Sequence, residues 1–234
     1  MNEQTLSLRL QRVGAAVPLG ARLADIGSDH AYLPVALMLK DKISFAVAGE
    51  VVKGPYESAH KQVLKNGLSE KIIVRLADGL AAIQPEDQIT AITIAGMGGT
   101  LIRSILENGL ISQQLSGKER LTLQPNVGEP GLRYWLMKNK YQIIHEEIIE
   151  EHQKIYELIV AEKAAAEPTY SEQEIFFGPF LLKEKNSVFQ KKWQREMQQR
   201  KRVLTQLKQA EELPKEKIQE ITQQLQWIQE VLEQ

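Results

Sequence analysis

Strand-like and helix-like segments alternate up to about residue 163, and this alternation constrains the fold more than any other feature of the chain. Runs rich in apolar and β-branched residues predict strands at residues 22–26, 44–50, 71–76, 90–95 and 120–123. Helical composition predicts helices at residues 31–40, 55–66, 100–107 and 129–139, with Pro34 tolerated in a first turn and Gly67 as a cap. Such alternation is typical of a parallel sheet with helices on both faces.

Two further strand-like runs, at residues 142–149 and 154–160, are close enough in sequence to form an antiparallel hairpin. This hairpin would supply an antiparallel edge to the sheet. The combination predicts an α/β fold with a class I Rossmann-like methyltransferase domain. A plain dinucleotide-binding fold shows the same alternation and is the alternative.

The pattern changes after residues 164–168, where strand-like runs end and Gln, Lys, Glu and Arg dominate. Two stripes recur at steps of three and four residues: Trp193, Met197, Arg200, Leu204 and Leu207, then Ile218, Ile221, Leu225, Ile228 and Leu232. Residues 211–214 separate them, and Pro214 suits the first turn of the second helix. The stripes predict an α-helical hairpin zipped as a short antiparallel coiled coil. We therefore expect a methyltransferase domain at 1–165 and a helical coiled-coil domain at 166–234.

The composition excludes several classes of chemistry. With 43% hydrophobic and 25% charged residues, the chain resembles an ordinary soluble globular protein. It has no cysteine, which removes disulfides, thiolate metal sites and cysteine nucleophiles. The four histidines are scattered, so we expect no metal site. No apolar run approaches the ~20 residues that span a bilayer, and the N-terminal residues lack a signal-peptide core, so we expect a cytoplasmic protein without membrane contact.

The net charge of −1 conceals two segments of opposite charge. Residues 146–174 contain nine acidic residues against two lysines, and residues 183–208 contain nine basic residues against two acidic ones. The basic segment is able to present a phosphate-binding face, or it is simply a solvated helix surface.

The sharpest local motif is Asp25-Ile26-Gly27-Ser28-Asp29-His30, where an acidic residue ends a strand and a glycine opens the turn into a helix. Open α/β sheets bind ligands at the carboxyl ends of their strands. A dinucleotide site would require further glycines to approach a pyrophosphate, and only Gly27 stands in that register. S-adenosylmethionine has no phosphate, so one close-approach glycine is sufficient.

Further acidic residues follow the next two strands. Glu50, with Val51 beside it, ends the second strand, where a carboxylate accepts hydrogen bonds from both ribose hydroxyls. Ala77-Asp78-Gly79 follows the third strand, where a carboxylate can bond the exocyclic amine of adenine. Each acid alone suits a solvated strand end, but their occurrence after three successive strands predicts a cofactor site.

The fourth and fifth strands end in motifs that suit an acceptor site. The fourth strand runs into Ala95-Gly96-Met97-Gly98-Gly99. Its three glycines either leave an open floor beside the methyl donor or simply form a flexible loop. The Pro-Pro motif usual in adenine-N6 methyltransferases is absent there, which counts against exocyclic amine chemistry. Gln124-Pro125-Asn126 follows the fifth strand, where the amides of Gln124 and Asn126 suit a base edge or close a turn.

These motifs together resemble the bacterial tRNA (adenine-22-N1)-methyltransferase family. The resemblance rests on residues 25–34, on Ala95-Gly96-Met97-Gly98-Gly99, on Leu123-Gln124-Pro125-Asn126 and on Leu132-Arg133-Tyr134-Trp135-Leu136, in family order. At residues 50–55 the chain departs mildly, because the family often has Asp and Asn there, but the carboxylate of Glu50 remains. The resemblance implies a Rossmann-like domain, a coiled-coil domain, S-adenosyl-L-methionine as cofactor and methyl transfer to N1 of adenine 22 in tRNA.

Asp29 is the predicted catalytic residue. The base methylated at N1 is cationic until a proton leaves N6, so a nearby carboxylate would favour the charge and accept the proton. Asp29 is alternatively a cofactor ligand or a cap of the following helix. His30 is expected either to orient the base or the carboxylate of the methyl donor, or to have a structural role. The predicted cofactor-binding set is Asp25, Gly27, Ser28, Asp29, His30, Glu50, Val51, Ala77, Asp78, Gly79, Gly96 and Met97.

The tRNA is expected to lie across both domains. Besides Gln124 and Asn126, the predicted substrate contacts are Arg9, Arg12, Lys191, Lys192, Arg195, Arg200, Lys201 and Arg202. We expect a monomer, although one arm of the hairpin pairing with another chain is an open alternative. The competing functions are a methyltransferase acting on another RNA or a small molecule, an inactive cofactor- or RNA-binding module, and a nicotinamide oxidoreductase.

Overall fold

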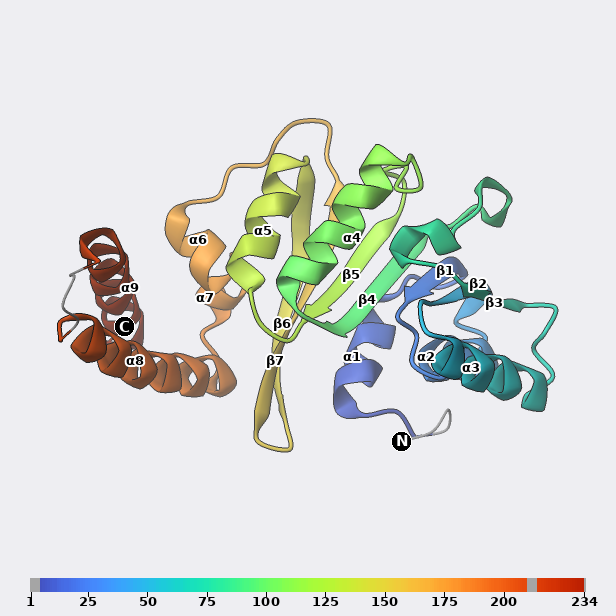
Figure 1. Cartoon of the computed structure of the whole chain (residues 1–234), viewed down its shortest axis with the longest axis horizontal. Helices are drawn as coiled ribbons and strands as arrows, with labels where there is room; N and C mark the ends of the chain where they lie inside the picture. Colours follow the sequence, from blue (N-terminus) through green and yellow to red (C-terminus); the bar gives the residue numbers. More distant parts are fainter. Residues whose placement is uncertain (1–4, 210–213, 234) are drawn as a thin grey trace.

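A seven-stranded sheet forms the centre of the computed structural model, which describes residues 5–209 and 214–233 (Figure 1). The strands are β1 (Ala21–Ile26), β2 (Ile43–Glu50), β3 (Ile72–Leu76), β4 (Ala91–Met97), β5 (Arg120–Pro125), β6 (Tyr141–Glu151) and β7 (Lys154–Lys163). Their order is β3-β2-β1-β4-β5-β7-β6. Strands β1 to β5 run parallel, and β7 is antiparallel to β5 and β6. The predicted α/β sheet with an antiparallel hairpin at its edge is confirmed.

Helices cover both faces of the sheet (Figure 1). They are α1 (Leu8–Ala16), α2 (Tyr32–Leu39), α3 (Lys53–Lys65), α4 (Gly99–Ile111) and α5 (Glu129–Lys138), with short 3-10 turns η1 (Gly79–Ala82) and η2 (Pro85–Asp87). One buried apolar cluster lies beneath α4, α5 and η1, and a second lies beneath α1, α2 and α3. Gly67 closes α3 in the left-handed conformation that glycine favours, as predicted. No helix in the described part of the chain combines the length and apolarity of a membrane span.

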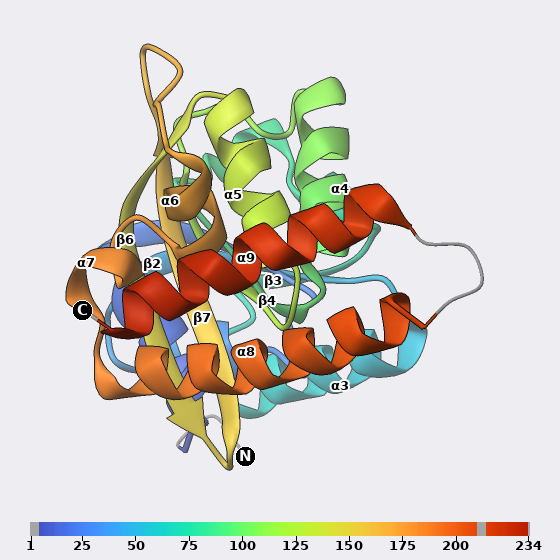
Figure 2. The same ribbon diagram turned by 90° about the vertical axis from the view of Figure 1, so that its left-hand side faces the viewer.

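The C-terminal part is helical: α6 (Glu172–Phe177), α7 (Leu181–Glu184), α8 (Ser187–Leu207) and α9 (Lys215–Glu233). Helices α8 and α9 pack together as a hairpin, seen face-on in Figure 2. The predicted stripes face inward, with Trp193, Ile221 and Ile228 buried. The predicted separating segment lies largely at residues 210–213, outside the described residues. Pro214 precedes α9, and its carbonyl accepts the first helical hydrogen bond, from Ile218 at 3.0 Å.

Three of these helices have no counterpart in the sequence prediction: α1, α6 and α7. Helix α1 is short, and its sequence mixes polar, charged and leucine residues; Val13 is its one fully buried apolar side chain. Helix α6 does carry a start signal. Ser171 accepts a hydrogen bond from the Glu174 N–H, and the Glu174 carboxylate accepts one from the Ser171 N–H. This capping box satisfies two backbone donors of a helix too short to show periodicity.

A buried ion cluster joins the sheet to the C-terminal helices. The guanidinium of Arg133, on α5, is 1% exposed and lies between Glu146 of β6 and Glu157 of β7. Lys192, on α8, donates to Glu157 at 2.6 Å and to Glu129, the first residue of α5, at 2.8 Å. Although burial opposes ionisation of Glu157, the positive charges of Lys192 and Arg133 outweigh it and lower its pKa.

The cluster also fixes the chain that enters α7. The second carboxylate oxygen of Glu146 accepts the Phe180 N–H at 3.0 Å. Gly178 adopts a φ of +95°, and a Cβ there would lie under 3 Å from both Glu146 and Arg133. Only glycine therefore lets the backbone pass this close to the ion pair.

We predict that Arg133→Met destabilises the protein by about 3–5 kcal/mol, because it leaves Glu146 and Glu157 buried without the cation that they share. Urea denaturation followed by circular dichroism measures the change. The matched control is Arg120→Met, which removes a partly exposed pair with Glu162 and should cost less than about 1 kcal/mol. Equal losses in the two variants would show that burial does not set the strength of the Arg133 cluster.

Candidate active site

Asp25 holds the first turn of the site together. Its side chain is buried at the end of β1 and accepts hydrogen bonds from the hydroxyls of Ser28 and Thr93, each at 2.6 Å. Thr93 lies beside Asp25 in the parallel pairing of β1 with β4. Burial raises the pKa of Asp25, since desolvation of the carboxylate outweighs the two hydroxyl hydrogen bonds. Asp25 thus ties the turn after β1 to the neighbouring strand.

Gly27 is where the turn requires glycine. Its φ is +69°, and a Cβ there would overlap the methyl group of Met97. Its N–H donates to the carbonyl of Gly49 at 2.9 Å, which holds the turn against β2. The glycine therefore leaves a cradle, bounded by Met97, at the carboxyl edge of the sheet.

Three further left-handed residues follow, Asp29, His30 and Ala31, with φ values of 42°, 67° and 56°. Such conformations are costly outside glycine and cluster at functional sites. The Asp29 N–H donates to a carboxylate oxygen of Glu50 at 2.6 Å, so an acid at the end of β2 holds this strained turn. Burial raises the pKa of Glu50.

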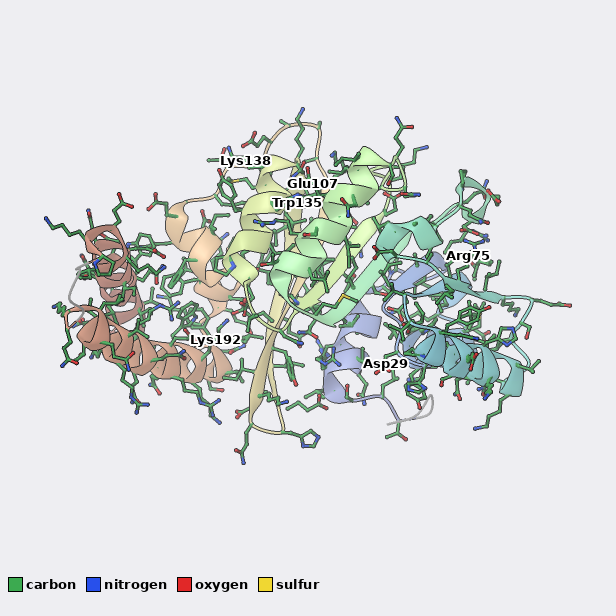
Figure 3. All side chains as sticks on the ribbon, viewed as in Figure 1. Asp29, Arg75, Glu107, Trp135, Lys138 and Lys192 are labelled. Carbon is green, nitrogen blue, oxygen red and sulfur yellow. The ribbon has the colours of Figure 1, made fainter. Side chains whose placement is uncertain are left out.

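The side chain of Asp29 does not cap the following helix. Helix α2 starts at Tyr32 with Ala31 as its flanking residue, which receives no side-chain hydrogen bond. The carboxylate of Asp29 is instead 72% exposed, 3.5 Å from the imidazole of His30. The ring of His30 stacks on Tyr32 at a centroid distance of 5.3 Å. Asp29 lies beside α1 and α2 in Figure 3.

The cofactor residues predicted after β2 and β3 lie along the same edge. The Ala77 N–H donates to the backbone carbonyl of Glu50 at 2.8 Å, which sets the start of the Ala77-Asp78-Gly79 turn beside β2. Asp78 is exposed and flanks η1, and Val51 is exposed as well. Asp78 and Gly79 border a small crevice against α4, and Gly27 is not part of its lining.

The turns after β4 and β5 are joined through amide side chains. The side-chain oxygen of buried Gln124 accepts from the Gly96 N–H at 3.0 Å and from the guanidinium of Arg9 at 2.6 Å. The Asn126 amide donates to the Gly96 carbonyl at 2.7 Å. These contacts bring α1, β4 and β5 together around one crevice.

This crevice has a volume of about 220 Å³. Its lining is Arg9, Leu10, Asp25, Gly27, Ser28, Asp29, Leu33, Ala95, Gly96 and Met97. Most of the predicted residues after β1 and β4 therefore converge. Arg9, predicted as a substrate contact, lines the crevice, and no ion pair joins it to a carboxylate in the described part of the chain. The sequence prediction missed Thr93, since a strand threonine shows its role only when the strand order is known.

The predicted basic contacts on α8 divide into paired and unpaired side chains. Lys191 binds Glu150 at 2.6 Å, and Lys192 belongs to the buried cluster (Figure 3). Arg195 forms an ion pair with Glu150 at 3.7 Å, donates to the backbone carbonyl of Gln153 at 3.2 Å and remains half exposed. Arg200 contacts Glu196 and Gln224 and covers the ring of Phe176.

Lys201 and Arg202 are exposed, and no ion pair joins them to the described residues. Arg12, on α1, pairs with Glu147 of β6 at 2.7 Å. The acidic and basic segments of the sequence thus neutralise each other in part. Among the described residues, no three His, Asp or Glu side chains cluster as metal ligands.

The comparisons with known proteins agree with this geometry. Residues 23–230 match the family model for TrmK, tRNA (adenine(22)-N(1))-methyltransferase. The chain is 47% identical over 239 residues to the tRNA (adenine(22)-N(1))-methyltransferase of Bacillus subtilis, covering 100% of this chain and 99% of the relative.

Solved structures show the same likeness. A putative tRNA (m1A22) methyltransferase of Streptococcus pneumoniae, in complex with S-adenosyl-L-methionine, is 47% identical with a TM-score of 0.88, covering 97% of this chain and 100% of that one. The M. capricolum TrmK, in complex with S-adenosyl-homocysteine, is 30% identical with a TM-score of 0.84, covering 97% and 98%. The chain therefore belongs to the family of S-adenosylmethionine-dependent tRNA (adenine(22)-N(1))-methyltransferases, as its sequence motifs predicted.

Proposed function

We propose that this chain methylates N1 of adenine 22 in tRNA at the crevice beside Gly27, and that Asp29 assists by accepting the proton released from the base. One observation carries the role of Asp29: its carboxylate is exposed at the crevice while its backbone is held in a strained conformation by Glu50. The side chain is therefore accessible to substrate, and the backbone that carries it is held in position.

The residues at the carboxyl edge suit S-adenosylmethionine. A Cβ at Gly27 would overlap the methyl group of Met97, which lines the same crevice, and Asp25 lies buried beside them. We assign the methionine portion to Asp25, Gly27, Ser28, Gly96 and Met97, with His30 at the mouth. We assign the ribose to Glu50, with Val51 beside it, and the adenine to Ala77, Asp78 and Gly79. When bound, the cofactor supplies an electrophilic methyl group.

Asp29 is well suited to the acceptor side of the reaction. N1 lies on the Watson–Crick edge, so the adenine must leave its stack to reach the crevice. Methylation makes the ring cationic, and the carboxylate of Asp29 stabilises that charge and accepts the N6 proton. The exposed amide of Asn126 borders the same floor and orients the base edge. Gln124, buried and bonded to Gly96 and Arg9, acts on the base only by holding this floor in place. Much of the rate enhancement then comes from holding the base in place.

Asp29→Ala should abolish turnover while leaving the Kd for S-adenosylmethionine within about tenfold, because general acid–base groups contribute about 10²–10⁴ to rate. Single-turnover methylation of an unmodified tRNA transcript measures the rate of methyl transfer. Calorimetry measures the Kd for S-adenosylmethionine. A transcript with adenine 22 replaced is the substrate control. Equal losses of affinity and turnover would assign Asp29 to cofactor binding instead.

Gly27→Ala should weaken S-adenosylmethionine binding by at least about tenfold, which is ~1.4 kcal/mol, because it pushes Met97 into the cradle. Gly20→Ala is the matched control, since Gly20 is also left-handed (φ +73°) and has open space around its Cβ position. Both variants carry a backbone cost of about 1–2 kcal/mol in stability. Equal affinities for the two variants would place the cofactor elsewhere.

The C-terminal residues 166–234 are proposed to position the tRNA. On α8 the side chains of Lys201 and Arg202 are the ones most free to contact phosphates. To reach a phosphate, the other basic side chains would have to leave carboxylate, carbonyl or amide partners; these are Lys191, Lys192, Arg195 and Arg200. Arg9 and Arg12 on α1 would contact the RNA from the catalytic side. Such contacts orient the substrate without reading its sequence. We further propose that the enzyme acts in the cytoplasm as a monomer.

Reversing charge with Lys201→Glu and Arg202→Glu should weaken tRNA binding and reduce the slope of log Kd against log salt by about one for each phosphate that the variant no longer binds. Affinity for S-adenosylmethionine should not change. The control is Lys71→Glu with Lys118→Glu, which makes the same charge change at the amino edge of the sheet. An unchanged slope in the α8 double variant would exclude this arm from the RNA interface.

A further inference from the structure

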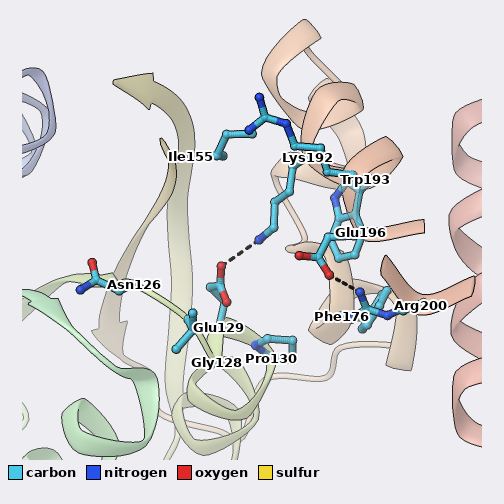
Figure 4. Close-up of a pocket in the computed structure, with 12 residues that line it drawn as sticks. Asn126, Gly128, Glu129, Pro130, Ile155, Phe176, Lys192, Trp193, Glu196 and Arg200 are labelled. Carbon is cyan, nitrogen blue, oxygen red and sulfur yellow. Dashed lines mark hydrogen bonds and ion pairs between the residues drawn. The ribbon is translucent and has the colours of Figure 1, made fainter. Parts of the chain in front are cut away.

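We propose that a cavity between α8 and the loop after β5 binds a second nucleotide of the tRNA, one next to adenine 22. The cavity has a volume of about 440 Å³ and is shown in Figure 4. This inference rests on the proposed tRNA function but concerns a different place in the molecule. It assigns a ligand to the space between the catalytic sheet and the helical hairpin.

Three separate parts of the chain build the cavity. Its base is the segment from Asn126 to Pro130, which leads from β5 into α5. Its walls are Ile155 of β7 and Phe176 of α6, and its far side is α8 from Lys192 to Arg200. Because these parts belong to both proposed domains, the cavity exists only where the hairpin is docked.

The chemistry of the lining is that of a nucleotide site. Aromatic Phe176 and Trp193 lie behind the cations Arg200 and Lys192, which stand about 5.3 Å from the ring centroids. With Arg195, the lining has three cations and two carboxylates, and each cation also pairs with a carboxylate. Unstacked RNA bases bind to aromatic rings and to the flat guanidinium of arginine, and their phosphates bind to cations.

One buried donor in this wall has no partner. Trp193 is 3% exposed, and its indole N–H makes no hydrogen bond in the described part of the chain. The indole nitrogen lies on the ring edge toward Lys192 (Figure 4). Buried donors nearly always have an acceptor, so this one points to an acceptor that arrives with a ligand. Base carbonyl oxygens and ring nitrogens are such acceptors.

The cavity and the reactive crevice share one wall. Asn126 lines the cavity, and its side-chain amide donates to the carbonyl of Gly96, which lines the crevice with Asp29. When adenine 22 leaves its stack, a neighbouring base loses a stacking partner. A neighbouring base held in the cavity would lie on the opposite side of the loop that carries Asn126. It would keep adenine 22 extended toward Asp29.

Transcripts with a single abasic nucleotide, immediately 5′ or 3′ of adenine 22, test the assignment. Each is assayed with the wild-type enzyme and with two cavity variants, Trp193→Phe and Arg195→Ala. Trp193→Phe removes the N–H but keeps an aromatic ring, and Arg195→Ala changes a half-exposed side chain. Lys208→Ala, an exposed basic residue at the end of α8 that does not line the cavity, is the control. The Kd for S-adenosylmethionine reports on folding.

We expect the loss of one neighbouring base to raise the KM for tRNA by about tenfold in the wild-type enzyme, within the range for stacking of one base. The same loss should change KM little in either cavity variant, whereas it should keep its full effect in Lys208→Ala. The assignment would be overturned if the abasic site and the cavity substitution changed KM independently of each other at both neighbouring positions. It would also be overturned if neither abasic site changed the KM of the wild-type enzyme. Failure of wild-type enzyme to methylate adenine 22 in intact transcript would instead contradict the proposed function.

Discussion

The buried cluster around Arg133 is the interaction on which the arrangement of the two halves depends. Its carboxylates come from the β6–β7 hairpin, and its second cation, Lys192, comes from α8. Removing one partner while the hairpin stays docked would leave a buried charge uncompensated, which is strongly destabilising, so the docked arrangement requires Lys192 and its carboxylates together. The same cluster requires glycine at position 178 and holds Glu129 at the start of α5. The docking of the hairpin and the loop that carries Asn126 are thereby linked.

The active-site edge shows a second constraint, in which a strained backbone fixes the position of side chains. Gly27, Asp29, His30 and Ala31 are all left-handed, interrupted only by Ser28, and such a turn would be unfavourable in an isolated peptide. Asp25 and Glu50 hold this turn from two neighbouring strands. Both carboxyl groups have raised pKa values because they are buried. The sheet therefore supports strain at the place where we propose that methyl transfer occurs.

The charge pattern illustrates what a linear sequence leaves open. The basic stretch in residues 183–208 suited either a phosphate-binding face or a solvated helix surface. Tertiary contacts turn Lys191 and Lys192 toward acidic residues of the β6–β7 hairpin, so the two oppositely charged segments pair. Their apposition depends on how α8 docks, which residue spacing along one helix does not specify. Lys201 and Arg202 retain the exposure that the sequence interpretation assumed.

The strands, most of the helices, the class of fold and the family could be predicted from the sequence, because hydrophobic periodicity and the motifs at strand ends are local properties of the chain. Helices α1, α6 and α7 could not. The sequence also placed Asp25, Gly27 and Gly96 at one edge, since the carboxyl ends of parallel strands lie together. Only the tertiary structure decided that Thr93 supports Asp25, that Arg9 enters the crevice, and that Lys192 is buried. These are contacts between residues 35 or more positions apart, formed by strand order and helix docking, and no local pattern encodes them.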